Sequence, residues 1–347
     1  MHSYRLALIG FGNVGQGFAQ ILRDRGADLA QRFGVEFQIV AVSDLQRGSV
    51  YAPEGLDPAA LLAAVDAGGS LERLPGAAHG WDAARTIVES GADVVVELSY
   101  TNLQTGEPAI THLTLALESG KHVVTTNKGP IALRYPELSA LARARGKEIG
   151  AEGTVMSGTP ALRLGQELLA AAGINRLQGI LNGTTNYILT QMENGATYAA
   201  ALAEAQARGY AEADPTGDVE GHDAAGKVVI LANLLLGAAL TLADVDRQGI
   251  TGLTPADIAS ARADGQRWKL IGSVEKKDGR VMASVRPTRL PLTHPLASVS
   301  YATNALTFST DLLGEVTLVG PGAGRLETGY ALVCDLLAID RKVTARG

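Results

Sequence analysis

The sequence predicts an α/β protein whose N-terminal part forms a doubly wound, mostly parallel sheet and whose later part forms a second domain of α+β type. Three observations support this prediction. Short apolar runs alternate with segments of helical periodicity, a glycine-rich turn follows the first run, and the order of elements changes near residue 136.

The first part contains four apolar runs that we expect to be buried strands. They are YRLALIG, EFQIVAVSD, GADVVVELS and GKHVVTTNK, at residues 4–10, 36–44, 91–99 and 120–128. Apolar positions recur at helical spacing in residues 11–26 and 108–120. Strands that alternate with helices form βαβ units, so the sheet should be parallel, with helices on both faces.

The second part begins with a helical segment and not with a strand. Helices are expected at residues 136–146 and 160–173, with a strand-like segment at 148–153 between them. A strand then runs through a Gly-Thr turn into another helix over residues 174–192. Turn residues separate three later strands, at 268–275, 280–288 and 304–311.

Composition and charge indicate a small-molecule ligand. The chain of 347 residues is long enough for two domains. Its 36 acidic residues outnumber its 30 basic ones, and no run of Lys or Arg supplies the positive surface that nucleic acid or an anionic membrane requires. The single Cys334, the absence of a signal-peptide pattern and apolar runs shorter than the roughly 20 residues of a membrane span predict a cytoplasmic protein.

The segment GFGNVG fits the fingerprint of a Rossmann-type dinucleotide-binding loop. Gly10 would allow the tight turn, Gly12 the close approach of a pyrophosphate, and Gly15 close helix–strand packing. The ligand would lie at the N-terminus of the following helix, which favours negative charge. We therefore expect a dinucleotide cofactor at this segment, with Gly10, Gly12 and Gly15 shaping its binding site.

The residues after the second strand leave the choice between NAD and NADP open. Asp44 ends this strand, where an acidic side chain would bind the ribose hydroxyls of NAD. Arg47 is close enough in sequence to bind the 2′-phosphate of NADP. The spacing from the glycine motif is longer than usual, and a turn aspartate after a strand is an equally good interpretation of Asp44.

Two lysines are candidate catalytic groups. Lys128 follows the carboxyl end of a predicted parallel strand, the edge at which ligands bind, although it could also be a surface lysine in a turn. Lys227 stands four residues after Asp223 on a predicted helix, so the two share one face. Because this helix turns strongly apolar after Lys227, we expect a buried pair rather than a surface ion pair. Glu212, Asp214 and Asp218 precede it, and such acids can hold a substrate ammonium group; we expect His222 to be solvated.

These motifs make the sequence resemble the homoserine dehydrogenases over almost its whole length. The segments that carry the resemblance lie at residues 10–15, 101–133, 181–190, 209–232 and 320–337. The resemblance implies NAD(P)-dependent interconversion of L-homoserine and L-aspartate 4-semialdehyde, on the route to threonine, methionine and isoleucine. Two alternatives remain: a dehydrogenase of another small amino-acid alcohol or aldehyde, and a non-catalytic NAD(P)-binding regulator, which the presence of both lysines disfavours.

The resemblance also implies roles for individual residues. Lys227 and Lys128 would transfer the proton, assisted by Asp223. The substrate would be bound by Glu212, Asp218, Asp223, Tyr210 and Thr184. The cofactor would touch the turn residues Phe11, Gly12, Asn13 and Val14, and also Thr101, Asn102, Lys128 and Gly322. The expected dinucleotide-binding domain therefore comprises residues 1–135 and about 310–347, and the expected substrate-binding, catalytic and dimerisation domain comprises residues 136–309.

Three further properties follow from the resemblance. A monovalent cation, usually sodium, would be bound by Glu152, Val155, Ser157 and Thr159. The protein would be a homodimer. Only RKVTARG follows Asp340, so we expect neither a C-terminal ACT domain nor feedback regulation through one.

Overall fold

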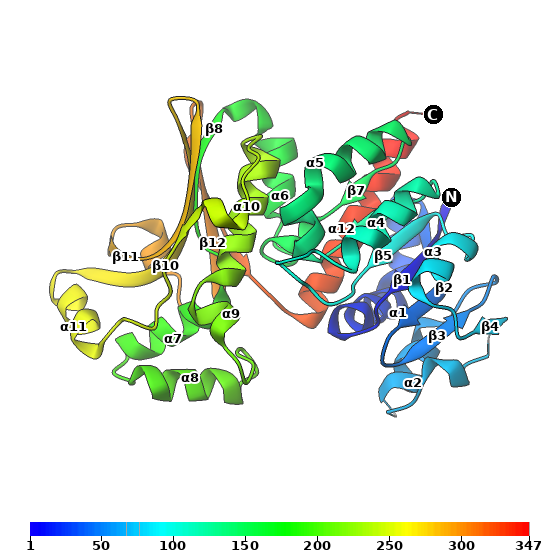
Figure 1. The fold of residues 1–347 in the computed structure, drawn as a ribbon, viewed down its shortest axis with the longest axis horizontal. Helices are drawn as coiled ribbons and strands as arrows, with labels where there is room; N and C mark the ends of the chain where they lie inside the picture. Colours follow the sequence, from blue (N-terminus) through cyan, green and yellow to red (C-terminus); the bar gives the residue numbers. More distant parts are fainter. Residues whose placement is uncertain (67, 76, 347) are drawn as a thin grey trace. The chain divides into compact units, whose positions relative to one another are not determined.

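The computed structural model describes residues 1–66, 68–75 and 77–346. The chain forms two compact units (Figure 1). The first unit is Met1–Gly158 together with Gly324–Gly347, and the second is Thr159–Ala323. No helix in the described ranges is long and apolar enough to cross a membrane.

The first unit is built on a seven-stranded sheet with the order β4-β3-β2-β1-β5-β6-β7. The five strands from β2 to β7 run parallel, whereas β3 and β4 add an antiparallel edge. Reversal of the strand order at β1 is the topological switch point of a doubly wound fold. The strands are β1 (His2–Ile9), β2 (Val35–Asp44), β3 (Gly48–Tyr51), β4 (Ala78–His79), β5 (Val94–Glu97), β6 (His122–Thr125) and β7 (Ile149–Gly150).

Two groups of helices pack in the first unit. One group contains α1, which contacts both α2 and α12; in the other, α4 contacts both α3 and α5 (Figure 1). The bounds are α1 (Asn13–Phe33), α2 (Pro58–Asp66), η1 (Leu71–Arg73), α3 (Ala83–Glu89), α4 (Ala109–Glu118), α5 (Lys128–Ala144), η2 (Glu152–Thr154) and α12 (Arg325–Thr344).

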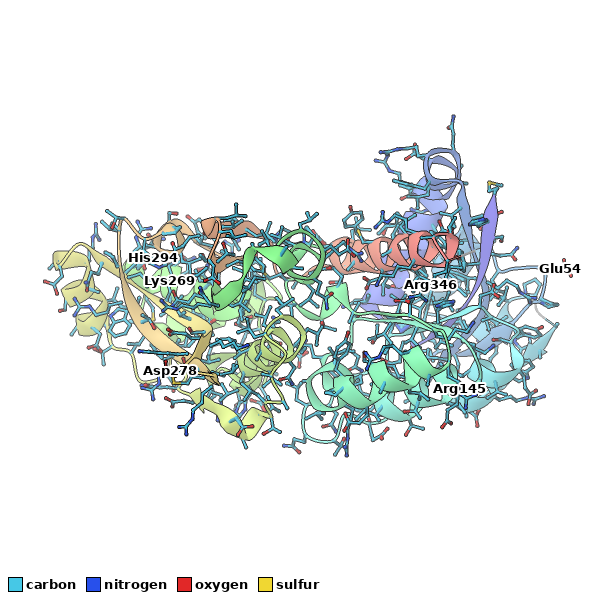
Figure 2. The ribbon with its side chains drawn as sticks, turned by 90° about the horizontal axis from the view of Figure 1, so that it is seen from above. Glu54, Arg145, Lys269, Asp278, His294 and Arg346 are labelled. Carbon is cyan, nitrogen blue, oxygen red and sulfur yellow. The ribbon has the colours of Figure 1, made fainter. Side chains whose placement is uncertain are left out.

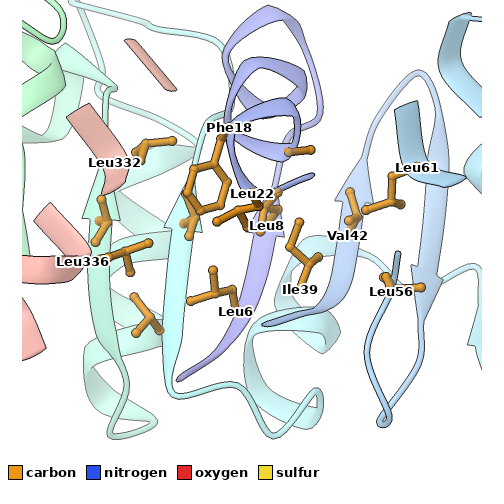
Figure 3. Close-up of a cluster of buried hydrophobic side chains, with 14 of the residues drawn as sticks. Leu6, Leu8, Phe18, Leu22, Ile39, Val42, Leu56, Leu61, Leu332 and Leu336 are labelled. Atoms are coloured by element: carbon orange, nitrogen blue, oxygen red, sulfur yellow. The ribbon is translucent and has the colours of Figure 1, made fainter. Parts of the chain in front are cut away.

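The C-terminal helix α12 completes the core of the first unit. Leu332 and Leu336 of this helix belong to the same buried cluster as Leu6, Leu8 and Phe18 from β1 and α1 (Figure 3). Just beyond the C-terminal end of this helix lies Arg346, which is labelled in Figure 2. Its Nη2 lies 2.6 Å from Glu148 Oε1. The chain therefore leaves the first unit at residue 158 and returns to it at residue 324.

The second unit contains a six-stranded sheet with the order β13-β12-β8-β10-β11-β9. Its strands pair antiparallel, except that β9 runs parallel to β11. This is the α+β arrangement that the sequence predicts, so the predicted fold class is confirmed for both parts. The strands are β8 (Ile174–Ile180), β9 (Val245–Arg247), β10 (Gln266–Lys277), β11 (Arg280–Pro291), β12 (Thr303–Thr310) and β13 (Gly314–Pro321).

Helices α7 and α10 pack against the strands of the second unit. Residues Ala224 to Ala232 of α10 are buried, because its sequence is apolar on all sides after the first turn. Leu164–Leu168 form a π-helical turn. The helices are α6 (Ala161–Arg163), η3 (Leu164–Leu168), η4 (Ala170–Ala172), α7 (Gly183–Glu193), α8 (Tyr198–Ala207), α9 (Thr216–Val219), α10 (His222–Leu235), η5 (Leu242–Asp244), α11 (Pro255–Ala263) and η6 (Pro295–Ser298).

The structure divides the chain at other positions than those expected. The expected boundary between residues 135 and 136 falls inside α5, and the strand at 148–153 becomes β7, which pairs with β6 of the first sheet. The expected return near residue 310 falls at the end of β12, after which β13 pairs back onto β12 in the second unit. Strand pairing therefore moves both divisions toward the C-terminus, to 158/159 and 323/324.

Candidate functional site

The glycine-rich turn lies between β1 and α1, and its three glycines are required for different reasons. Gly10 has φ of 100°, and a Cβ there would lie 2.6 Å from the carbonyl oxygen of Leu98. A Cβ on Gly15 would lie 3.0 Å from the carbonyl oxygen of Gly10. A Cβ on Gly12 would meet no atom within 4 Å, and its φ of −73° suits any residue. Packing therefore explains Gly10 and Gly15, whereas Gly12 leaves open space beside the helix.

That open space suits the diphosphate of a dinucleotide. Helix α1 starts directly after Gly12 without a side-chain cap, and its first turn carries no acidic residue. The backbone N–H groups of a first helical turn have no acceptor within the helix, and they attract anions. The open space and the N–H groups therefore fit the diphosphate of a nicotinamide dinucleotide. Phe11 precedes Gly12 in the turn, and Asn13 and Val14 are the first residues of α1.

Asp44 holds this turn together. Its Oδ2 accepts a hydrogen bond from the Phe11 backbone N–H at 2.7 Å, and its Oδ1 accepts from the N–H groups of Gln46 and Arg47 at 2.9 and 3.0 Å. The half-buried Arg47 is fixed through its carbonyl oxygen, which accepts from the Ser70 hydroxyl and from the N–H of Leu71. Asp44 thus has the structural function of a turn aspartate after a strand, which is one of the two interpretations that its sequence position allows.

Lys128 is the first residue of α5, just beyond the carboxyl end of β6. The preceding Asn127 is 2% exposed and caps α5 by accepting the Gly129 N–H at 3.1 Å. Its Nδ2 donates to the carbonyl oxygens of Ser99 and Tyr100 at 3.2 and 3.1 Å. Asn127 therefore ties the start of α5 to the loop that contains Thr101 and Asn102.

The loop after β5 also rests on a buried polar cluster. Glu97 is fully buried, its Oε1 lies 3.3 Å from His112 Nδ1, and its Oε2 accepts from the Thr125 hydroxyl at 3.3 Å. The Ser99 backbone and hydroxyl both donate to Oε1. Asn102 closes the loop by accepting the N–H groups of residues 104 and 105 with its Oδ1.

In the second unit, Lys227 and Asp223 form the ion pair that their spacing predicts, with Lys227 buried and Asp223 half-buried. Lys227 is 8% exposed, and its Nζ donates to Asp223 Oδ2 at 2.7 Å and to the carbonyl oxygen of Leu181 at 2.6 Å. Both side chains project from the first turns of α10, which begins after Gly221, a glycine with φ of 79°. His222, at the start of the same helix, is exposed.

Asn182 joins this pair to a second carboxylate. Its Nδ2 donates to Asp218 Oδ1 at 2.6 Å and to Asp223 Oδ2 at 3.1 Å. Burial raises the pKa of Asp218 above its ordinary value, the Asn182 hydrogen bond lowers it, and the charge of Asp223 raises it again. The charge of Lys227 and the hydroxyl of Thr184 lower this pKa further.

The remaining proposed substrate residues are Thr184, Tyr210 and Glu212, and they differ in their contacts and exposure. The Thr184 hydroxyl donates to the carbonyl oxygen of Tyr210 at 2.6 Å, which links α7 to the segment after α8. The Tyr210 ring packs against Tyr187, with ring centroids 5.0 Å apart. Glu212 is exposed; its carbonyl oxygen, not its carboxylate, accepts a hydrogen bond from Gln206 at 3.0 Å.

The candidate cation loop is buried and has an unusual backbone. Glu152 and Val155 are buried, and Met156 and Ser157 have φ of 59° and 55°, although neither is a glycine. Two consecutive left-handed residues are costly and turn neighbouring carbonyl groups sharply. The Ser157 hydroxyl lies 2.7 Å from Thr328 Oγ1, and the Thr159 hydroxyl donates to the carbonyl oxygen of Pro321 at 2.9 Å. Among the described residues, no group of three His, Cys, Asp or Glu side chains could hold a metal ion.

Gly322 has a local packing reason for being glycine. It belongs to the second unit, and a Cβ there would overlap the side chain of Asn304. The other expected cofactor residues belong to the first unit.

Asn127 and Asn182 are the residues that sequence reasoning missed. Each precedes a helix and follows a strand, a pattern that identifies a helix N-cap. The pattern cannot show that the amide of Asn182 reaches two carboxylates some 40 residues later.

The parallel sheet, the glycine-rich turn at the start of α1 and the buried lysine–carboxylate pair define an NAD(P)-binding oxidoreductase. Comparison with known proteins identifies which one. A family model described as homoserine dehydrogenase, NAD binding domain, matches residues 10–152, and one described as homoserine dehydrogenase matches residues 160–337. The chain belongs to the homoserine dehydrogenase family.

Individual relatives agree with this assignment. The NAD(+)-dependent homoserine dehydrogenase of Pseudomonas canavaninivorans is 50% identical over 100% of this chain and 99% of its own length. A crystal structure of a homoserine dehydrogenase from Thiobacillus denitrificans has a TM-score of 0.86 at 35% identity and covers 99% of this chain, which spans 75% of that one. A hyperthermophilic archaeal homoserine dehydrogenase in complex with NADPH has a TM-score of 0.84 at 29% identity, with 98% of both chains covered.

The chain is therefore an NAD(P)-dependent homoserine dehydrogenase, which interconverts L-homoserine and L-aspartate 4-semialdehyde by hydride transfer. The match to an NAD-binding domain confirms that the cofactor is a nicotinamide dinucleotide, as the glycine motif predicts. The predicted family and enzyme class are confirmed as well.

Proposed function

We propose that Lys227 is the group that donates to, or withdraws a proton from, the reacting oxygen of the substrate. The hydrogen-bonded contact between Lys227 and Asp223 carries this proposal. An ammonium group has three N–H donors. Asp223 and the Leu181 carbonyl take two of them, which leaves one for a substrate oxygen. Asp223 orients the ammonium and compensates its charge in a buried position.

A nicotinamide cofactor held at the glycine-rich turn would supply the hydride chemistry, and the protein residues stabilise the charge that develops on the substrate oxygen. When the semialdehyde is reduced, negative charge grows on its carbonyl oxygen, and a fixed ammonium stabilises it. We assign Lys128, at the start of α5, to the same proton pathway and to cofactor contact.

Asp218 and Glu212 are proposed to bind the ammonium group of the substrate, with Thr184, Tyr210 and Asp223 completing the site. Asp218 supports this assignment best, because it is half-buried beside Asp223 and held by an amide. Glu212 is exposed and lies on the segment that follows Tyr210. Cofactor contacts are assigned to residues 10–15, Asp44, Thr101, Asn102 and Gly322.

NAD is proposed as the preferred cofactor. A carboxylate has about four acceptor positions, and three backbone N–H groups occupy three of those on Asp44. One position remains for a ribose hydroxyl, whereas a 2′-phosphate would meet a like charge. The Pseudomonas relative is named as NAD(+)-dependent. Arg47→Ala should then change KM for NAD(H) little; a preference for NADP(H) that disappears in this variant would show that Arg47 selects the phosphate.

A sodium ion is proposed in the loop 152–159, bound by Glu152 and by the carbonyl oxygens of Val155, Ser157 and Thr159. The two left-handed residues Met156 and Ser157 support it, because such backbone is retained where a function compensates its cost. Sodium should raise the melting temperature of the wild type relative to choline at equal ionic strength, and Glu152→Gln should remove the difference.

We also propose a cytoplasmic homodimer, on the basis of the single cysteine and of family membership. Light scattering on the purified protein would give the subunit number directly.

The substrate assignment is tested by comparing kcat/KM for L-homoserine with that for its one-carbon homologues. We expect L-homoserine to be preferred, and Asp218→Asn to raise its KM while the Kd for NADH stays near that of the wild type. A homologue that is used more efficiently would assign the site to another amino-acid alcohol.

A further inference from the structure

Asn182 is locked in one orientation by the helix that it caps. Its Oδ1 accepts the Thr185 N–H at 2.9 Å and the Thr185 hydroxyl at 3.0 Å, and the residue is 4% exposed. Because the oxygen must face these donors, the Nδ2 group is forced to face the opposite side. The amide therefore has a defined direction that does not depend on the groups it meets there.

On that side the Nδ2 group meets two carboxylates from another segment. One N–H is directed to Asp218 Oδ1 at 2.6 Å and the other to Asp223 Oδ2 at 3.1 Å. The same Asp223 Oδ2 accepts from Lys227 at 2.7 Å. One neutral amide thus joins the proposed ammonium-binding carboxylate to the carboxylate that orients the proposed proton donor.

We propose that Asn182 is a positioning residue of the reaction, which holds Asp218 and Asp223 in one fixed arrangement for the substrate ammonium. This inference rests on the roles proposed above for Asp218 and Asp223. Two carboxylates in a partly buried site repel one another, and a shared donor of two hydrogen bonds offsets that repulsion without adding charge.

The electrostatics of Asp218 give the inference a measurable consequence. Burial and the charge of Asp223 raise the pKa of Asp218. The groups that lower it are Asn182 and Thr184 from the start of α7 and Lys227 from α10. Without the amide of Asn182, Asp218 takes up a proton at higher pH and loses its attraction for a cationic substrate.

Two substitutions remove the donor while keeping an oxygen to cap α7. Asn182→Ser leaves a neutral hydroxyl, which is a good helix cap, and Asn182→Asp keeps shape and cap but adds a third carboxylate. Both should lower kcat/KM for homoserine, by roughly tenfold or more for the lost charge-assisted hydrogen bonds. In both, the acid limb of the pH profile of kcat/KM should move to higher pH, with the larger shift in Asn182→Asp, and the Kd for NADH should stay unchanged.

Asn186→Ser is the matched control for loss of a buried amide on the same helix. The Asn186 Nδ2 donates to the carbonyl oxygens of Val299 and Thr303 and, in the part of the chain that the structure describes, to no carboxylate. This variant should therefore lower stability without moving the acid limb. Asp218→Asn separates the two proposals. If it leaves the KM for homoserine unchanged, the substrate site is wrong and the inference falls with it. If it raises KM while folded Asn182→Ser and Asn182→Asp keep the wild-type acid limb, the assignment of Asn182 alone is overturned.

Discussion

Two buried lysines of the second unit differ in their hydrogen-bond partners: one is paired with a carboxylate, and the other contacts neutral oxygens. Lys227 is paired with the Asp223 carboxylate. Lys269, labelled in Figure 2, is fully buried, and its Nζ donates to the neutral oxygens of Asn186 and Val299, at 3.1 and 2.7 Å. Burial lowers the pKa of Lys269 to about 8, partly offset by the charge of Glu193.

This shift predicts a pH dependence of stability. The pKa of Lys269 is about 8 in the folded protein against an ordinary value of 10.5, so between these pH values the unfolded chain binds more protons. The free energy of unfolding should therefore rise with pH across this interval, by up to about 3 kcal/mol. Urea titrations of the wild type and Lys269→Met at several pH values isolate the contribution. Parallel pH curves for the two proteins would contradict it.

Gly12 offers a second prediction at the level of one residue. Alanine fits its backbone and meets no atom, so Gly12→Ala should fold normally. Its methyl group would occupy the space proposed for the diphosphate and raise the Kd for NADH by about tenfold or more, the equivalent of roughly 1.4 kcal/mol. Gly26→Ala, inside α1 and equally open, is the control. It should leave the Kd unchanged and stabilise the fold by about 0.5–1 kcal/mol.

Among the elements, the sequence predicts those whose sequence pattern is local. Apolar runs locate β1, β2, β5 and β6, and the i,i+4 spacing places Lys227 beside Asp223. Partner choice is not local, which is why β7 was expected in the second domain and β13 was not expected at all. The convergence of Asn182, Asp218 and Asp223 likewise depends on how α7 and α10 pack, which no single segment encodes.

Helix α12 should contribute strongly to the stability of the first unit. Leu336 is 1% exposed inside the core of the first unit, far in sequence from the strands it covers. Leu336→Ala should lower the free energy of unfolding by about 2–5 kcal/mol, as deletion of a buried leucine side chain does. Leu326 of the same helix is 43% exposed, and Leu326→Ala should cost far less. Denaturant unfolding of both variants decides this, and similar losses would mean that α12 contributes little to the core.

In the whole molecule, most residues proposed for cofactor binding lie in the first unit, and those proposed for substrate binding lie in the second. The glycine-rich turn and Lys128 lie in the first unit, and Asp218, Asp223 and Lys227 lie in the second. The chain crosses between the units at 158/159 and 323/324. Substitutions of Asp218, Asp223 or Lys227 should therefore affect homoserine kinetics and leave cofactor affinity intact, and Gly12→Ala should do the reverse.

Lys227 is the residue proposed to exchange a proton with the reacting oxygen of the substrate. Single-turnover hydride transfer from L-homoserine to NAD⁺, followed by NADH absorbance at saturating substrate, tests this proposal most directly. Lys227→Ala should slow this step by on the order of 10²-fold or more, with comparatively little change in KM, because the ammonium matters most in the transition state. Near-normal hydride transfer in Lys227→Ala, together with its loss in Lys128→Ala, would contradict the claim and identify Lys128 as the proton-transfer group.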